Sequence, residues 1–291
     1  MHRPGLFLCC FFFAFCASSV AQQEIRTAND FYERNIVKTQ RAIRYPFIRQ
    51  SDVVWSVAIW KKIEVSEAFN QFFYFPIDPS ADSTEKSLAN ILWDAVAADE
   101  IPIYEDEQMD VPLDNLAFVK RMTKPDTLML EIGYDDDFNE EYETVVKSHD
   151  FDGAEVLQYT FREVWFIGKQ DTRQDSRRIS LAPMRAAYRR LGKSDEEIYL
   201  GMQPLFWVPM LNPRVRDLLA RYEARTEEVN MAAWPSWDFI FVNQHYEAYV
   251  VRKSNTFDRD ISRYLTGEDV LFEASEIEAK VFEIENDMWD Y

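Results

Sequence analysis

The sequence predicts an α+β fold, with a helical N-terminal part over about residues 22–100 and a mixed α+β part over about residues 101–291. In the second part we expect an antiparallel sheet with packed helices. Apolar residues recur at helical spacing before residue 100 and again near the C-terminus, whereas runs of β-branched and aromatic residues fill the middle of the chain. This order of helices, strands and helices favours α+β over a parallel α/β sheet.

The composition is that of a globular chain with an acidic surface. A length of 291 residues suits one large domain or two modest ones, and 47% hydrophobic residues are enough for a core. The formal net charge is −19 at pH 7. Nucleic acids and anionic membrane surfaces bind clustered lysine and arginine, so the negative charge argues against both as partners.

The first 21 residues are typical of a cleaved secretory signal peptide. Arg3 makes the start positive, residues 6–17 form an apolar run, and residues 19–21 are small. The run is too short to cross a hydrocarbon layer of roughly 30 Å as a helix. We therefore expect an exported protein without a membrane span, whose mature part, residues 22–291, begins near Gln22.

All cysteines of the chain lie in this signal segment, at Cys9, Cys10 and Cys16. The mature protein is therefore expected to lack cysteine. This excludes a disulfide, a thiolate metal site and a cysteine nucleophile from the mature chain.

Two helices are expected in the N-terminal part. Asp82 and Glu85 have the spacing of a capping pair, and the apolar residues behind them predict a helix over residues 83–98. Upstream, Asp52 could cap a shorter helix. That helix would carry the apolar residues Val54, Trp55, Ile59 and Trp60.

The middle of the chain predicts strands. Residues 127–132, 156–167 and 177–183 are rich in β-branched and aromatic side chains, and a polar loop separates the last two segments. This pattern predicts an antiparallel hairpin over about residues 155–182. A further strand is expected over residues 246–251.

The C-terminal third predicts two helices. Asn212 followed by Pro213 supplies an N-cap and a proline at the first helical position. The last helix is amphipathic, because four apolar residues share one stripe and acidic residues occupy the other positions. The stripe consists of Ile277, Val281, Ile284 and Met288.

The residues of the mature chain do not form a catalytic or cofactor motif. Its two histidines, His149 and His245, have no partner motif around them, and the glycine-rich loops of nucleotide-binding proteins are absent from the sequence. The acidic run 135–140 fails the calcium-loop pattern, because Glu140 stands where glycine is required. We therefore predict no enzyme activity, no cofactor and no metal site.

Glu163 is the acidic residue with the most unusual position. It would share a strand face with Phe161 and Trp165, where a carboxylate has either a raised pKa or a cationic partner. Arg177 and Arg178 lie across the expected hairpin. The simplest interpretation is an ion pair within the sheet.

Charge is distributed unevenly along the chain. Residues 162–193 contain nine basic and three acidic residues, whereas residues 268–290 contain nine acidic residues and only Lys280 as a base. Surfaces of opposite charge permit a head-to-tail contact between copies, which closes into a ring when the rotation allows it. Two separately solvated surfaces would produce the same pattern. The candidate contact residues are Arg173, Arg177, Arg178, Arg185, Arg189, Arg190, Glu276, Glu283 and Asp287.

Blocks of residues from about position 50 to the C-terminus resemble, in the same order, the family of gliding motility protein GldN, called PorN in non-gliding relatives. They include Val54-Trp55-Ser56, Glu163-Val164-Trp165-Phe166, Phe206-Trp207-Val208, Lys253-Ser254-Asn255 and the tail from Phe282 to Trp289.

The resemblance implies a structural subunit of the type IX secretion and gliding motility machinery. Such a protein lies in the periplasm at the inner face of the outer membrane. It forms a ring of many copies with a GldK/PorK-like outer-membrane lipoprotein, and a GldM/PorM-like periplasmic domain is its other neighbour. The family brings no catalytic residues.

A second hypothesis belongs to another class of protein. Abundant carboxylates, together with tryptophans such as Trp234 and Trp237, would also suit a secreted carbohydrate-active enzyme or a glycan-binding protein. That protein would have a concave pocket with two carboxylates and aromatic platforms, whereas a ring subunit would have flat or convex apolar patches.

Overall fold

The computed structural model describes residues 41–75, 86–122, 125–134, 140–148, 151–169, 174–190, 197–226, 235–257 and 259–289. All of these residues belong to one compact unit, residues 37–291. The signal segment, His149, Arg173 and Trp234 lie outside the described residues.

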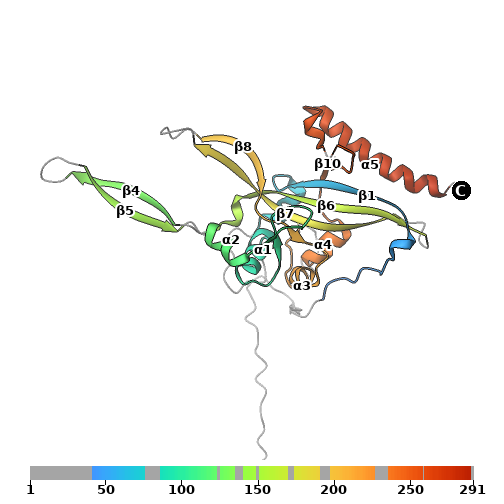
Figure 1. Ribbon diagram of the computed structural model, residues 1–291, viewed down its shortest axis with the longest axis horizontal. Coiled ribbons are helices and arrows are strands. Elements are labelled where there is room, and N and C mark those ends of the chain that lie inside the picture. The colour runs from blue at the N-terminus through green and yellow to red at the C-terminus, as the bar shows by residue number, and fades with distance from the viewer. Residues whose placement is uncertain are drawn as a thin grey trace, which may run out of the picture. The chain divides into compact units, whose positions relative to one another are not determined.

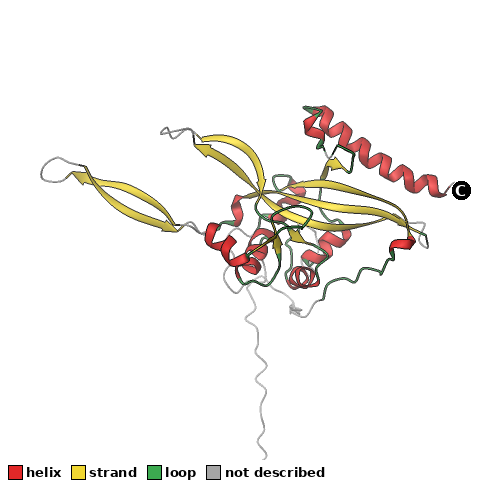
Figure 2. Cartoon of the chain, in the orientation of Figure 1, coloured by secondary structure: helices red, strands yellow, loops and turns green. Residues whose placement is uncertain are grey.

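An antiparallel sheet forms the centre of the fold, and its strands follow the order β10-β1-β6-β7-β8 (Figure 1). A short strand, β9, pairs with β7 beside this order. Helices and sheet are both prominent, so the chain is α+β (Figure 2). The strands of this sheet are β1 (Val53–Glu64), β6 (Val156–Gly168), β7 (Gln174–Arg190), β8 (Glu197–Pro204), β9 (Val208–Pro209) and β10 (Tyr249–Lys253).

The predicted short helix behind Asp52 is wrong, because residues 53–64 form the strand β1. Asp52 ends the single 3-10 turn η1 (Gln50–Asp52). Strand β1 pairs with β10 and β6, and it contributes Ile63 to one apolar cluster and Ile59 to another. Burial alternates along β1 except at residues 59–61, where its pairing with β10 has a bulge, and the adjacent apolar residues Ile59 and Trp60 imitated a helical pattern. The described part of residues 22–100 is therefore not purely helical.

The predicted hairpin is confirmed as the pair β6–β7. Its register places Glu163 opposite Arg178 and Phe161 opposite Leu181, with a bulge between Arg162 and Glu163. Strand β7 continues to Arg190, beyond the predicted end of the hairpin. The extra residues pair with β8, which the sequence did not predict.

Two smaller hairpins complete the strands. The pair β4 (Pro125–Tyr134) and β5 (Glu140–Ser148) confirms the strand predicted over residues 127–132. Strands β2 (Ile103–Tyr104) and β3 (Pro112–Leu113) form the other hairpin. Of the acidic run tested as a calcium loop, residues 135–139 lie outside the described residues and Glu140 begins β5.

The predicted helices occur, although not all begin where expected. Helix α1 (Leu88–Ala97) begins later than predicted because Ser87 is its N-cap, with the hydroxyl oxygen accepting from the Asn90 N–H at 3.3 Å. The expected cap Asp82 lies outside the described residues. The other helices are α2 (Asn115–Met122), α3 (Pro213–Arg221), α4 (Trp237–Asn243), α5 (Glu268–Trp289) and the 3-10 turns η2 (Ala68–Phe73), η3 (Gly153–Glu155) and η4 (Ile261–Arg263).

Two C-terminal predictions are confirmed and one is shifted. The Asn212 side chain accepts from the Arg214 N–H at 2.9 Å and caps α3, as its sequence indicated. Helix α5 covers the predicted amphipathic segment. The strand expected over residues 246–251 begins only at Tyr249, because Tyr246 packs on the main core instead.

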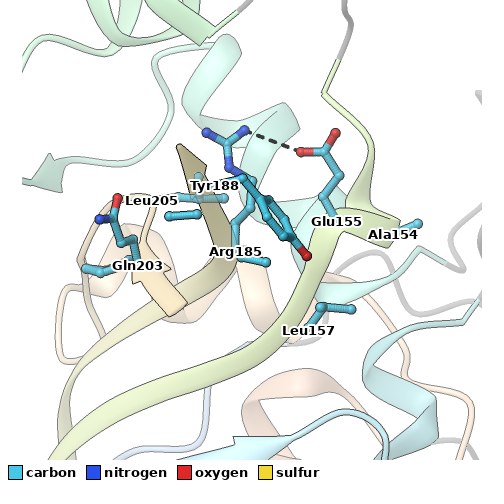
Figure 3. A pocket seen from close by; sticks show the side chains of 10 residues that line it. Ala154, Glu155, Leu157, Arg185, Tyr188, Gln203 and Leu205 are labelled. Atoms are coloured by element: carbon cyan, nitrogen blue, oxygen red, sulfur yellow. Dashed lines mark hydrogen bonds and ion pairs between the residues drawn. The ribbon is translucent and has the colours of Figure 1, made fainter. Parts of the chain in front are cut away.

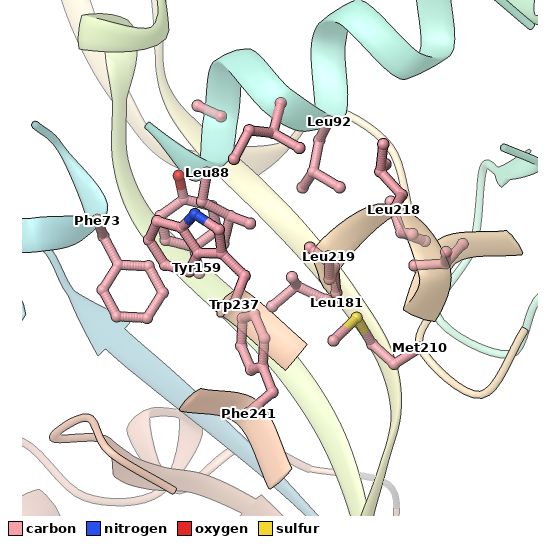
Figure 4. Packing of buried hydrophobic residues seen from close by; sticks show 14 of the residues in the cluster. Phe73, Leu88, Leu92, Tyr159, Leu181, Met210, Leu218, Leu219, Trp237 and Phe241 are labelled. Atoms are coloured by element: carbon pink, nitrogen blue, oxygen red, sulfur yellow. The ribbon is translucent and has the colours of Figure 1, made fainter. Parts of the chain in front are cut away.

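The main core lies between the sheet and helices α1, α3 and α4 (Figure 4). Its centre is aromatic, since the ring of Phe73 lies 5.2 Å from Trp237 and 5.3 Å from Tyr159. Helix α1 adds Leu92 and helix α3 adds Leu219, both fully buried. This cluster spans residues from Ile63 to Phe241 in sequence and therefore ties the N- and C-terminal halves together.

A second, smaller cluster attaches α5 to the sheet near β10 and β1. It consists of Val57, Ile59, Val250, Ile261, Ala274, Ile277 and Val281. The three members from α5 share one stripe at helical spacing. Helix α5 is thus held by one narrow apolar face.

Candidate functional site

The free edge of the sheet carries the first candidate interaction surface. Strand β6 pairs with β7 only as far as Arg185, so residues 186–190 of β7 and 197–202 of β8 continue as a two-stranded arm, here called the edge ribbon. Within the described residues β8 has no strand partner on its other side. An edge strand of this kind presents unpaired backbone groups to a partner.

The edge ribbon exposes large apolar side chains. Tyr188, Ile198, Tyr199 and Leu200 are each between 47% and 59% exposed, and the rings of the two tyrosines lie 5.7 Å apart. A bulge places Ala187 opposite Gly201 and Tyr188 opposite Tyr199, so Leu200 is the extra residue of β8. Gly201 has a φ of +114°, which side-chain-bearing residues rarely adopt. Because three successive residues of β8 are exposed, both faces of the edge ribbon are open to solvent.

A groove of about 660 Å³ lies at the base of the edge ribbon (Figure 3). The side chains of Leu157, Tyr188 and Leu205 line it together with an ion pair. In that pair Arg185 Nη1 lies 3.3 Å from Glu155 Oε2. The groove thus combines a mainly polar lining, including a partly exposed arginine, with a few apolar side chains, which suits the side chains of another protein.

Helix α5 carries the second candidate surface. Ala274, Ile277 and Val281 are buried against the sheet, whereas the opposite positions are exposed. The exposed residues Leu271, Phe272 and Phe282 are apolar, at 53% to 68% exposed. They alternate with exposed carboxylates, and we call this set the outer face of α5: Glu268, Leu271, Phe272, Glu276, Phe282 and Glu283.

Only a few polar contacts modify the outer face of α5. Lys280 Nζ lies 2.7 Å from Glu276 Oε1 one turn earlier, and this hydrogen bond raises the pKa of Lys280 above its ordinary value. The ring of Phe282 touches Trp165 edge-on, with 5.9 Å between ring centroids. Ser275, which is exposed on the same side, donates to the Phe272 carbonyl at 2.8 Å.

A buried ion network ties α5 to the sheet. Lys61 Nζ lies 3.2 Å from Glu163 Oε1 and 2.9 Å from Glu278 Oε1 of α5. Glu163 is 1% exposed and also lies 3.8 Å from Arg178 Nε. The predicted ion pair of Glu163 with an arginine across the hairpin is therefore confirmed for Arg178, and Lys61 is a second partner that the sequence pattern missed.

Arg178 is a core residue and not a surface contact, which corrects one of the predicted contact residues. Its guanidinium donates to the Tyr246 hydroxyl at 3.1 Å and to the Val242 carbonyl at 3.3 Å. Burial opposes the charge, but nearby Tyr246 and Glu163 outweigh this effect, so the pKa of Arg178 lies above its ordinary value. Burial is the largest cause of the strongly raised pKa of Tyr246, and Glu163 adds to it while Arg178 opposes it.

The Arg177 side chain also contacts other residues of its own chain. It donates a short hydrogen bond to the Pro46 carbonyl, and its guanidinium lies 5.1 Å from the centre of the Tyr45 ring. Arg216 lies 4.2 Å from the same ring and is bonded to Asp238. Among the predicted arginines Arg177 therefore anchors residues 45–46, and its availability to a partner is reduced.

The remaining predicted contact residues divide between the two surfaces. Arg185 borders the groove, and the register places Arg189 opposite Ile198 and Arg190 opposite Glu197 in the edge ribbon. Glu276 and Glu283 lie on the outer face of α5, and Asp287 follows one turn later on the same helix. Sequence reasoning missed the apolar residues of both surfaces. The signals were the unbroken run Ile198-Tyr199-Leu200 and the apolar Leu271-Phe272 on the polar side of the helix.

The described residues contain no group of three or more His, Cys, Asp or Glu side chains that could hold a metal ion. His245 packs with the ring of Phe239 at 5.8 Å. In the groove at the base of the edge ribbon Glu155 lies beside Arg185. A second hollow is lined by Trp60, Glu107 and Asp110, and Glu107 forms an ion pair with Arg252.

Only the carbohydrate-binding hypothesis required Trp237 as an exposed platform for a glycan, and the structure does not offer it. Its side chain is fully buried in the main core. In addition, no helix within the described residues is both long and apolar enough to cross a membrane.

Comparison with known proteins adds one finding. A family model described as gliding motility associated protein GldN matches residues 48–290, which is most of the chain. No curated protein matches the sequence.

Proposed function

The chain belongs to the GldN family of gliding motility associated proteins, and from this premise we propose that it is a non-enzymatic structural subunit of the type IX secretion and gliding motility machinery. In this proposal the signal peptide directs it to the periplasm. There it assembles with a GldK/PorK-like outer-membrane lipoprotein into a ring at the inner face of the outer membrane. A GldM/PorM-like periplasmic domain is its second neighbour.

The observation that carries the proposal is the exposure of large apolar side chains on two separate elements. The edge ribbon and the outer face of α5 each expose three or more such residues. Exposed apolar groups of this size are costly in water unless a partner covers them, and clusters of them mark protein interfaces. Two such surfaces on one chain suit a subunit with at least two neighbours.

The proposal is tested by purifying the affinity-tagged mature chain from the envelope of the bacterium that makes it. We expect an outer-membrane lipoprotein to co-purify in a stoichiometric, high-mass complex. Recovery of the chain as a monomer that binds glycans would reject the proposal in favour of a carbohydrate-binding role.

A charge-reversal variant sharpens this test. Replacing Arg185, Arg189 and Arg190 by Glu should disperse the complex while the circular dichroism spectrum of the purified chain stays unchanged. The matched control replaces Arg44, Arg49 and Arg214, which are exposed elsewhere, by Glu. This control changes the net charge equally and should leave the complex intact. Unchanged recovery of the complex with the first variant would show that these three arginines are not needed for assembly.

A further inference from the structure

We propose that residues 43–47 form a releasable strap, and that the strap closes a binding socket for an extended, aromatic segment of a partner protein. The strap is itself the ligand of the socket in this structure, so its contacts reveal which chemistry the socket recognises. All of these contacts lie within one chain. The proposal therefore holds whether or not the proposed ring forms.

The socket is built from three elements of the fold. It consists of Arg177 of β7, Arg216 of α3 and Asp238 of α4. Arg216 and Asp238 are both buried, and they are joined by two hydrogen bonds of 2.9 and 3.0 Å. A bidentate arginine–carboxylate pair has a fixed geometry. We therefore expect the socket to keep its shape when the strap leaves.

The strap inserts an aromatic ring among these charged groups. The centre of the Tyr45 ring lies 4.2 Å from the guanidinium of Arg216 and 5.1 Å from that of Arg177. Two residues earlier, the Ile43 N–H donates to Asp238 Oδ2 at 2.7 Å. A guanidinium group over an aromatic ring is attracted to the negative face of the ring. The socket thus recognises an aromatic side chain together with a backbone N–H group beside it.

The residue after the tyrosine adds a backbone acceptor. Arg177 Nη2 donates to the Pro46 carbonyl. A residue that precedes proline is biased towards an extended conformation, so Tyr45 loses little conformational entropy when it binds. Arg177 Nε is buried and has no hydrogen-bond partner in the described part of the chain. Because an unpaired buried donor is costly, a segment that brings one more acceptor to Arg177 would bind better than the strap does.

The strap lacks the apolar burial that holds the rest of the fold together. None of residues 41–49 is buried, and none belongs to either apolar cluster. Phe47 is 87% exposed. In Figure 1 this part of the chain is the blue loop that leads to the start of β1. Exposed segments with few apolar contacts open at a low cost in free energy, so the strap can leave while the core stays folded.

The strap makes binding of a partner conditional. Because it is tethered beside its socket, its effective concentration there is on the order of millimolar. A partner segment that offers only the same contacts therefore competes poorly. It gains the socket where other contacts already hold the partner in place, or where it also pairs with Arg177 Nε.

The proposal is tested by competition between the strap and a free copy of it. The probe is a fluorescein-labelled peptide with the sequence of residues 41–49, and the protein is the purified chain of residues 22–291. The parent chain should bind the peptide weakly, because its own strap fills the socket. Tyr45→Ala removes the ring from the strap. In fluorescence anisotropy this variant should bind the peptide more tightly than the parent, by a factor of about ten or more.

Two variants and a second peptide serve as controls. Phe47→Ala removes an exposed ring from the same strap, so it should bind the peptide as weakly as the parent. Adding Arg177→Gln to Tyr45→Ala should abolish binding, and circular dichroism checks that each chain is folded. A peptide in which alanine replaces Tyr45 should bind to none of the chains.

Two outcomes of the binding experiment would overturn the proposal. Equal binding of both peptides would show only the attraction of a basic peptide to an acidic chain. Equal binding of the tyrosine peptide by the parent and by Tyr45→Ala would show that the strap does not compete for the socket.

Limited proteolysis measures release of the strap directly. Arg44 is exposed, but trypsin can cleave after it only when the neighbouring residues leave the socket and enter the protease. Cleavage at this bond, identified by mass spectrometry, should be slow in the parent and in Phe47→Ala and several-fold faster in Tyr45→Ala. Equal rates in the parent and in Tyr45→Ala would show that the ring does not hold the strap, and the proposal would fail.

Discussion

Helices α1 and α5 differ in how much of their surface is buried against the rest of the fold. Helix α1 buries six of its ten residues in the main core, whereas α5, among its described side chains, buries only the stripe of Ala274, Ile277 and Val281. The first helix is committed to the interior of its own chain. The second keeps a narrow attachment and leaves the rest of its surface for other contacts. The comparison suggests that the main core provides stability and the α5 region provides assembly.

The strongest test of this comparison removes a large side chain from the main core. Trp237→Ala deletes a fully buried ring that contacts Phe73, so we expect the free energy of unfolding to fall by about 4 kcal/mol. Urea denaturation followed by circular dichroism measures the change. Phe239→Ala on the same helix is the control, because its side chain is 39% exposed and should cost much less. Equal losses in the two variants would contradict the position given to Trp237.

The next test breaks the ion network between the sheet and α5. Glu163→Gln leaves the buried Lys61 and Arg178 without their shared carboxylate, and breaking a buried pair costs about 3 kcal/mol. Denaturant titration measures the loss. Glu278→Gln removes the other carboxylate beside Lys61, but that side chain is 38% exposed, so we expect a distinctly smaller effect. A larger loss of stability from Glu278→Gln than from Glu163→Gln would contradict this prediction and show that the contact with α5 matters more.

A smaller effect is expected from the cluster under α5. Ile277→Ala deletes methyl groups from a small apolar cluster and should destabilise the attachment of α5 by about 2 kcal/mol. We expect amide hydrogen exchange to accelerate in α5 while α1 remains protected. Leu271→Ala, on the exposed side of the same helix, should leave exchange unchanged. Equal acceleration in α1 and α5 would show that the two regions unfold as one unit.

The smallest effect concerns a pH-dependent turn between β2 and β3. N–H groups of Val111 and Asp110 donate to the Asp106 carboxylate, and these backbone hydrogen bonds hold its pKa below its ordinary value. A lowered pKa in the folded state stabilises the protein above the ordinary pKa of 3.8 and loses this contribution as the pH falls further. Thermal melts should therefore show Asp106→Asn slightly less stable than the parent at pH 7. The difference should shrink as the pH falls below 3.8, and a difference that grows on acidification would contradict this assignment.

Local signals predicted several elements well. The Asn212-Pro213 pair marks the start of α3, the aromatic run of β6 marks a strand, and the apolar stripe around Ile277 marks the buried side of α5. Each of these features depends on residues within one or two turns or on one strand. The ion pair of Glu163 was also predictable, because its partner lies directly across a recognisable hairpin.

Other features depended on contacts between distant parts of the chain. Residues 53–64 became the strand β1 because β10 and β6 flank them, and neither neighbour is visible in the local pattern. Arg177 and Arg178 are adjacent in a basic segment, yet each contacts a tyrosine from a remote segment: Arg177 contacts Tyr45 and Arg178 contacts Tyr246. The apolar residues of the edge ribbon are exposed because no strand lies beyond β8 in the described sheet, and no local pattern shows this.

The sequence by itself determined the family, the acidic and basic segments, the cap of α3 and the amphipathic stripe of α5, because composition, capping and periodicity are properties of neighbouring residues. Only the tertiary structure decided which charges are neutralised inside and which surfaces remain open. Burial and ion pairing depend on which distant segments the fold brings together, as Lys61, Glu163 and Glu278 illustrate.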